Sequence, residues 1–110
     1  MTTFEMLQEL LAQNEFELLL PEDHTANTTE QDIRLVYQMN DTVESFLVFR
    51  EAIFTGTYKK DYEGELEASY GRDNDRYVLG VRQGDSVITL FYRKLELEVN
   101  LYNSGEIAHF

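Results

Sequence analysis

The chain has 110 residues and a formal net charge of −12 at pH 7, and it contains no cysteine. The charge argues against nucleic-acid binding, because contact with phosphates needs a positive field, and the lack of cysteine excludes disulfides and zinc–thiolate sites. No apolar stretch approaches the ~20 residues of a membrane-spanning helix, and we expect a cytoplasmic protein folded as one domain over residues 1–110.

A helix is predicted over residues 3–14, because apolar residues recur there at helical spacing: Phe4, Leu7, Leu10 and Leu11. Thr2 and Glu5 have the spacing of a capping box at its start. The last turn contains no Lys or Arg, so packing of the apolar stripe onto a sheet must supply most of the stability of this helix.

Two strands with a loop between them are predicted next. Residues 16–20 alternate between two faces and predict a short strand that ends at Pro21. Residues 21–32 are polar and rich in turn formers, which predicts a loop. Apolar residues alternate again over residues 33–39 and predict a second strand.

Residues 42–54 allow two interpretations. Asp41 and Glu44 have capping spacing, and the apolar residues share one helical face: Val43, Phe46, Leu47, Ile53 and Phe54. The run Phe46-Leu47-Val48-Phe49 is rich in strand formers, however, and a hairpin turn at Asn40-Asp41 is the alternative. The capping spacing favours a second helix over residues 42–54.

A three-stranded meander is predicted over residues 62–93. Gly84-Asp85 suits a two-residue type II′ turn, which pairs Val81 with Ile88, Leu79 with Leu90, and Tyr77 with Tyr92. The loop at residues 72–75 pairs Tyr70 with Tyr77, Ala68 with Leu79, Leu66 with Val81, and Glu65 with Arg82. These pairings place the apolar residues on one face of the meander and the charged residues on the other.

Beyond the meander, apolar residues alternate from Leu95 to Leu101. A straight strand would turn them to the face opposite Ile88 and Leu90, so we expect a bulge or sharp bend near Arg93-Lys94. A turn at residues 103–105 and a last strand at residues 107–110 complete the chain. The predicted fold class is α+β: a curved antiparallel sheet of five to seven strands with the N-terminal helix on one face.

Several residue patterns suggest chemistry, and each has a simpler structural interpretation. Asp61, Glu63, Glu65 and Glu67 are interpreted as the solvated face of a strand. Asp73-Asn74-Asp75 lacks the spacing of a calcium loop and predicts a hairpin turn. His24 stands beside Glu22 and Asp23, but adjacent residues on a loop rarely converge on one metal ion, and His24 and His109 share no recognisable spacing. We expect no catalytic residue, no metal site and no cofactor.

Three tyrosines, Tyr70, Tyr77 and Tyr92, lie side by side in the predicted meander. Aromatic side chains on a sheet can stack bases, but the acidic composition opposes that role. We therefore interpret them as core residues whose hydroxyls reach the rim of the sheet.

The leading functional hypothesis is a non-catalytic interaction module that binds a basic protein, as inhibitors and immunity-like proteins do. Eight carboxylates precede the first basic residue, Arg34, and a concentrated charge steers association. Six of them are the predicted partner-binding residues: Glu15, Glu17, Glu22, Asp23, Glu30 and Asp32. The alternative is a small-molecule or lipid-binding domain with an apolar cavity between helix and sheet. A third hypothesis is self-association through an edge strand.

Overall fold

The structure is a computed structural model that describes residues 1–20, 30–59 and 64–101. Over these residues it consists of one helix and an antiparallel sheet of seven strands, which confirms the predicted α+β arrangement. The elements are α1 (Thr3–Ala12), β1 (Leu18–Leu19), β2 (Gln31–Met39), β3 (Val43–Thr57), β4 (Glu67–Asp73), β5 (Arg76–Gln83), β6 (Ser86–Tyr92) and β7 (Lys94–Leu101).

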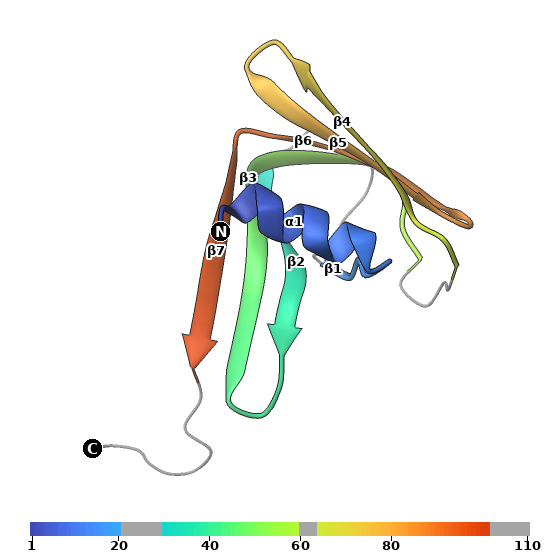
Figure 1. The fold of residues 1–110 in the computed structure, drawn as a ribbon. Coiled ribbons are helices and arrows are strands. Elements are labelled where there is room, and N and C mark those ends of the chain that lie inside the picture. Colours follow the sequence, from blue (N-terminus) through green and yellow to red (C-terminus); the bar gives the residue numbers. More distant parts are fainter. Residues whose placement is uncertain (21–29, 60–63, 102–110) are drawn as a thin grey trace.

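The long strand β3 belongs to both parts of the sheet (Figure 1). The strand order is β1-β2-β3-β6-β5-β4, and β7 also pairs with β3. Residues 43–50 of β3 lie between β2 and β7, whereas residues 53–57 pair with β6. We call β1, β2, β7 and residues 43–50 of β3 the helix half, and β4, β5, β6 and residues 53–57 of β3 the meander half.

The two halves meet at a bend. It lies near Glu51 in β3 and at Arg93, between β6 and β7, which both pair with β3. Glu51 has a φ of 51° within the continuous strand β3, and Arg93 separates β6 from β7. The Arg93 amide donates to the carbonyl of Arg50 at 3.1 Å, so Arg93 is hydrogen-bonded to the residue next to Glu51. The bend predicted near Arg93-Lys94 is therefore confirmed.

The helix α1 lies across β2, β3 and β7, close to the bend (Figure 1). The predicted capping box is present, with the Glu5 amide donating to Thr2 and the Thr2 amide donating to Glu5. One face of α1 is buried against the sheet, through Met6, Leu7, Leu10 and Leu11. These side chains close a core whose largest fully buried members include Phe49, Phe54, Ile33, Leu35 and Leu47.

The second predicted helix, residues 42–54, is wrong, because these residues form most of β3. The Asn40 side-chain oxygen accepts from the amides of Thr42 and Val43 at 2.9 Å each, which closes the β2–β3 hairpin at the alternative turn. Residues 45–49 are all buried, and Phe46-Leu47-Val48-Phe49 form a continuous apolar run instead of an alternation.

Within the meander, the predicted register of β5 and β6 is confirmed and that of β4 and β5 is wrong. Tyr70 lies opposite Leu79 instead of Tyr77, and Ala68 lies opposite Val81. Glu67, not Glu65, faces Arg82, and Leu66 precedes the strand. The cause is a two-residue turn: Asn74 takes a φ of 57° and Asp73 pairs with Arg76, which shifts β4 by two residues and keeps its faces.

The remaining strand predictions have mixed outcomes. The strand at residues 33–39 is confirmed and begins earlier, at Gln31, while the strand at residues 16–20 is reduced to β1. On β7, Leu95 and Leu97 pair with the core residues Phe49 and Leu47 of β3, as the bend requires. The apolar residues Leu97, Val99 and Leu101 nevertheless stay exposed. The predicted turn at residues 103–105 and strand at residues 107–110 lie outside the described residues.

Candidate binding cavity

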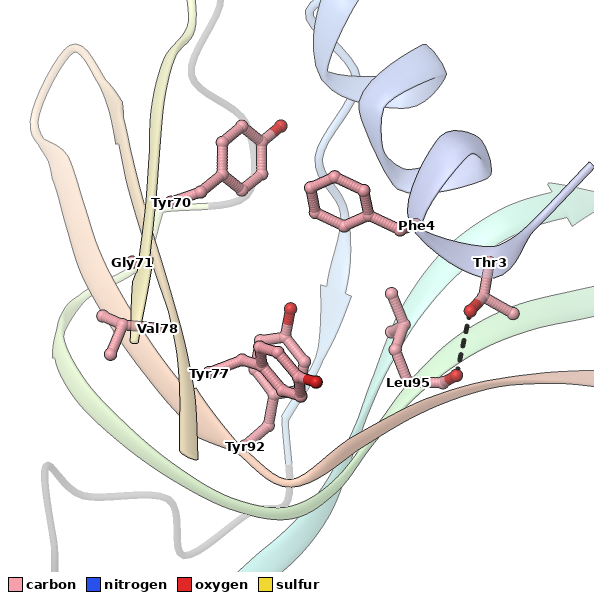
Figure 2. A pocket seen from close by; sticks show the side chains of 8 residues that line it. All are labelled: Thr3, Phe4, Tyr70, Gly71, Tyr77, Val78, Tyr92 and Leu95. Carbon is pink, nitrogen blue, oxygen red and sulfur yellow. Dashed lines mark hydrogen bonds between the residues drawn. The ribbon is translucent and has the colours of Figure 1, made fainter. Parts of the chain in front are cut away.

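A cavity of about 430 Å³ lies between the first turn of α1 and the meander half. Figure 2 shows Phe4 and Tyr70 on opposite sides of this space and the rings of Tyr77 and Tyr92 at its base. The described residues that line it are Thr3, Phe4, Tyr70, Gly71, Tyr77, Val78, Tyr92 and Leu95. Its volume falls in the range of about 300–1,000 Å³ that is typical of small-molecule sites.

The sheet positions the tyrosines through its alternation and its pairing. Tyr77 lies directly opposite Tyr92, and their ring centroids are 5.7 Å apart. Tyr92 continues into the core, where it meets Phe49 edge to face at 4.9 Å. Tyr70 reaches across to Phe4, at 5.2 Å and 70° between the planes. The four aromatic side chains thus border one space instead of filling it.

The interpretation of all three tyrosines as core residues is therefore wrong for two of them. Tyr92 is only 4% exposed, but Tyr70 and Tyr77 are each 44% exposed. The helix packs on the helix half and contacts Tyr70 of the meander half through Phe4, which is itself 41% exposed. The face of β4 and β5 that was expected to be covered is instead an open wall of the cavity.

The helix is held at the cavity by one hydrogen bond. The Thr3 hydroxyl donates to the carbonyl of Leu95 at 3.0 Å, which joins the start of α1 to the start of β7 (Figure 2). Leu95 follows the bend by two residues, so its side chain and Phe4 form the side of the cavity opposite β4. The cavity therefore depends on the bend and on the seating of α1 together.

The hydroxyls in the cavity differ from the other described tyrosine hydroxyls. Tyr58 donates to the carbonyl of Phe16 and accepts from the amide of Leu18, each at 3.0 Å, and Tyr37 donates to Glu9 at 3.1 Å. The hydroxyls of Tyr70, Tyr77 and Tyr92 have no hydrogen-bond partner within the described part of the chain. Because a buried tyrosine normally finds one, the Tyr92 hydroxyl is available to a bound molecule.

Burial raises the pKa of two of the tyrosines. It raises the pKa of Tyr92 to about 12, with a smaller contribution from Tyr70 and Tyr77, and it also raises the pKa of Tyr70. Because an ordinary tyrosine has a pKa of about 10, both phenols are neutral at pH 7, and burial extends this neutral range to higher pH. The eight described lining residues include no Asp, Glu, Lys, Arg or His, so the wall combines aromatic surface with hydroxyl groups.

The predicted partner-binding carboxylates do not form one free surface in the part of the chain that is described. Glu30 pairs with Arg76 and, at 3.8 Å, with Arg93, while Asp32 pairs with Arg50 at 2.8 Å. Glu15 is exposed and Glu17 is half-buried. Glu22 and Asp23 lie outside the described residues.

The structure describes some of the other residue patterns that were considered for chemistry in the sequence. Asp73-Asn74-Asp75 forms the predicted hairpin turn, and Asp75 pairs with Arg93, whose hydrogen bond lowers the pKa of that carboxyl. Glu65 lies before β4, so the predicted acidic strand face begins only at Glu67. The remaining residues of these patterns lie outside the described residues: Asp61, Glu63, His24 and His109. No group of potential metal ligands and no helix able to span a membrane occurs among the described residues.

Comparison with known proteins identifies a family. A family model described as a domain of unknown function, DUF3878, matches residues 1–110. The chain belongs to this family. No curated protein and no solved structure matches this DUF3878 chain significantly.

Proposed function

We propose that this DUF3878 domain binds a small molecule with an aromatic or apolar body in the cavity between α1 and the meander half. The observation that carries the proposal is an open space of about 430 Å³ bordered by four aromatic side chains. A domain that used these aromatics only for stability would bury them, yet Phe4, Tyr70 and Tyr77 are more than two-fifths exposed. Exposed aromatic surface of this kind gains free energy when a ligand covers it.

The chemistry of the wall supports a ligand that is mainly apolar. Ring faces and aliphatic side chains favour a flat or branched hydrocarbon group, and the phenols can donate hydrogen bonds to a few acceptors. A strongly hydrated ligand would lose its water without receiving enough hydrogen bonds in return. This chemistry favours the small-molecule hypothesis over the acidic-surface hypothesis.

The test is titration with N-phenyl-1-naphthylamine, an uncharged probe whose fluorescence rises in apolar sites. We expect saturable binding, and at least a tenfold weaker affinity in Tyr70→Ala and Tyr77→Ala, whose side chains are exposed enough to be removed without unfolding. Val87→Ala is the matched control, since Val87 is 51% exposed and does not line the cavity. No saturable binding, or equal losses in the control, would contradict the proposal.

Binding of a basic protein is the second proposal, and the net charge of −12 favours it. Internal ion pairs already engage Glu30 and Asp32, so Glu15, Glu22 and Asp23 would have to contribute most. A basic protein captured at low salt and released at roughly 0.5 M salt would support this function. Charge reversal at Glu22 and Asp23 should slow its association, and an unchanged rate would count against the proposal.

A further inference from the structure

Arg72 stands beside the cavity and has no function in the fold described so far. It lies on β4 directly opposite Tyr77 and two residues after Tyr70, so it is on the same face as both. Its guanidinium carbon is 5.0 Å from the centre of the Tyr77 ring. Tyr92 contacts the Tyr77 ring as well, so the three side chains form a row from the solvent to the core.

Arg72 forms no close ion pair in the part of the chain that the structure describes. Arg34, Arg50, Arg76 and Arg93 each pair with at least one carboxylate, whereas no ion pair to Arg72 or to Arg82 occurs among the described residues. Within the described part of the chain, its one hydrogen bond is a long contact of 3.4 Å from Nε to the carbonyl of Asn74.

The two carboxylates nearest to Arg72 along the chain do not pair with it. The alternation of the strand turns Asp73 to the other face. Asp75 forms its ion pair with Arg93, and Arg72 adds only a weaker attraction at longer range to the lowering of the pKa of that carboxyl. In a chain with 21 acidic and nine Lys or Arg residues, an arginine without a carboxylate partner keeps N–H groups that can bind an added anion.

A guanidinium with free N–H groups binds a carboxylate through short, paired hydrogen bonds. These contacts act over a few ångströms, whereas the repulsion from distant acidic residues is screened beyond about 8 Å at physiological salt. A single arginine matches a single negative charge, so phosphate esters and dicarboxylates would meet too few cations. The apolar wall next to Arg72 requires the rest of the ligand to be apolar.

We infer that the cavity binds a small aromatic monocarboxylate, with its ring against Phe4, Tyr70 and Tyr77 and its carboxylate on Arg72. This inference rests on the proposed small-molecule function and adds the charge of the ligand to it. The phenol hydroxyls assist by donating to the second carboxylate oxygen or to a substituent on the ring. Arg72 is thus the residue that selects an acid over a neutral molecule of the same shape.

The test compares 4-phenylbutanoate with 4-phenylbutanamide by isothermal titration calorimetry on the full chain, because the two compounds differ little except in charge. We expect the acid to bind at least tenfold more tightly, and this preference to disappear in Arg72→Gln. Arg82→Gln is the matched control: Arg82 lies opposite Glu67 and away from the cavity, so the preference should persist.

Equal binding of acid and amide, or a preference that survives Arg72→Gln, would overturn the role of Arg72. Binding of N-phenyl-1-naphthylamine without any binding of 4-phenylbutanoate would overturn the inference and leave the proposed function intact. Failure of all three compounds to bind would overturn both.

Discussion

The helix half and the meander half share the strand β3, yet α1 packs on the inner face of the helix half and leaves part of the meander half open. In the helix half, Leu35, Leu47 and Phe49 are completely buried beneath α1. In the meander half, the equivalent face ends in tyrosines that remain partly exposed. A helix of ten residues spans only about 15 Å, so on a sheet that bends it covers one half and leaves a space beside the other.

The largest expected contrast is between removing a core ring and removing a cavity ring. Phe49→Ala should lower the free energy of unfolding by about 3–5 kcal/mol, because it leaves a void in the buried core of the helix half. Tyr70→Ala should lower it by less than about 1 kcal/mol, since its ring is exposed. Urea denaturation of both variants measures the difference. Similar losses would show that the cavity wall is a second core.

Two glycines of the meander half sharpen the comparison at the level of the backbone. Gly56 has a φ of +107°, and a Cβ there would lie 2.1 Å from the carbonyl oxygen of Val87, so Gly56→Ala should destabilise the protein by more than about 2 kcal/mol. Gly71 is the matched control, because its added Cβ would meet only the Val78 side chain at 3.9 Å. Thermal denaturation should separate the two variants by several degrees, and equal melting temperatures would contradict the geometry.

High pH should lower the free energy of unfolding, because Tyr92, which lies between the cavity and the core, ionises there. The native pKa of about 12 lies above the unfolded value of about 10, so the native state holds this proton more tightly. The stabilisation is complete below pH 10 and is lost as the pH rises through 12, by about 3 kcal/mol in total for a shift of about two pKa units. Denaturation of wild type and Tyr92→Phe between pH 9 and pH 12 isolates the effect, because only the wild type should show this component of the decline. Identical slopes would mean that Tyr92 ionises freely.

The smallest expected effect concerns the capping of the helix. Thr2→Ala removes the acceptor for the Glu5 amide and should lower the free energy of unfolding by about 1 kcal/mol. Thr2→Ser keeps the hydroxyl and should restore most of that value. Chemical denaturation distinguishes the two variants, and an equal loss in both would assign the effect to the methyl group of Thr2 instead.

Local signals in the sequence were sufficient for much of the fold. The capping residues Thr2 and Glu5 located α1, and the Gly84-Asp85 turn set the register of β5 and β6. They failed where tertiary burial removes the alternation, as in residues 45–49 of β3, whose side chains are buried on both faces. They also failed where the length of a turn decides the register, as at Asn74.

The cavity was harder to predict than the strands around it. The alignment of the tyrosines was visible in the sequence, and so was the idea of a space between helix and sheet. Coverage by α1 could not be read from the sequence, because it depends on where the bend places Leu95 relative to Phe4. Arg72 gave no signal at all, since its lack of a partner follows from Asp75 pairing with Arg93.

The sharing of β3 also determines the order in which the chain can fold. Gln83 and Ser86 of the β5–β6 hairpin are almost adjacent in sequence, whereas Leu47 of β3 pairs with Leu97 of β7, 50 positions later. Because closing a longer loop loses more chain entropy and distant contacts form more slowly, we expect the hairpin to form early and β7 to dock late. The tyrosine face would then stay open to solvent throughout refolding until β7 brings Leu95 to the helix, and a ligand that needs the complete cavity would bind only after that last step.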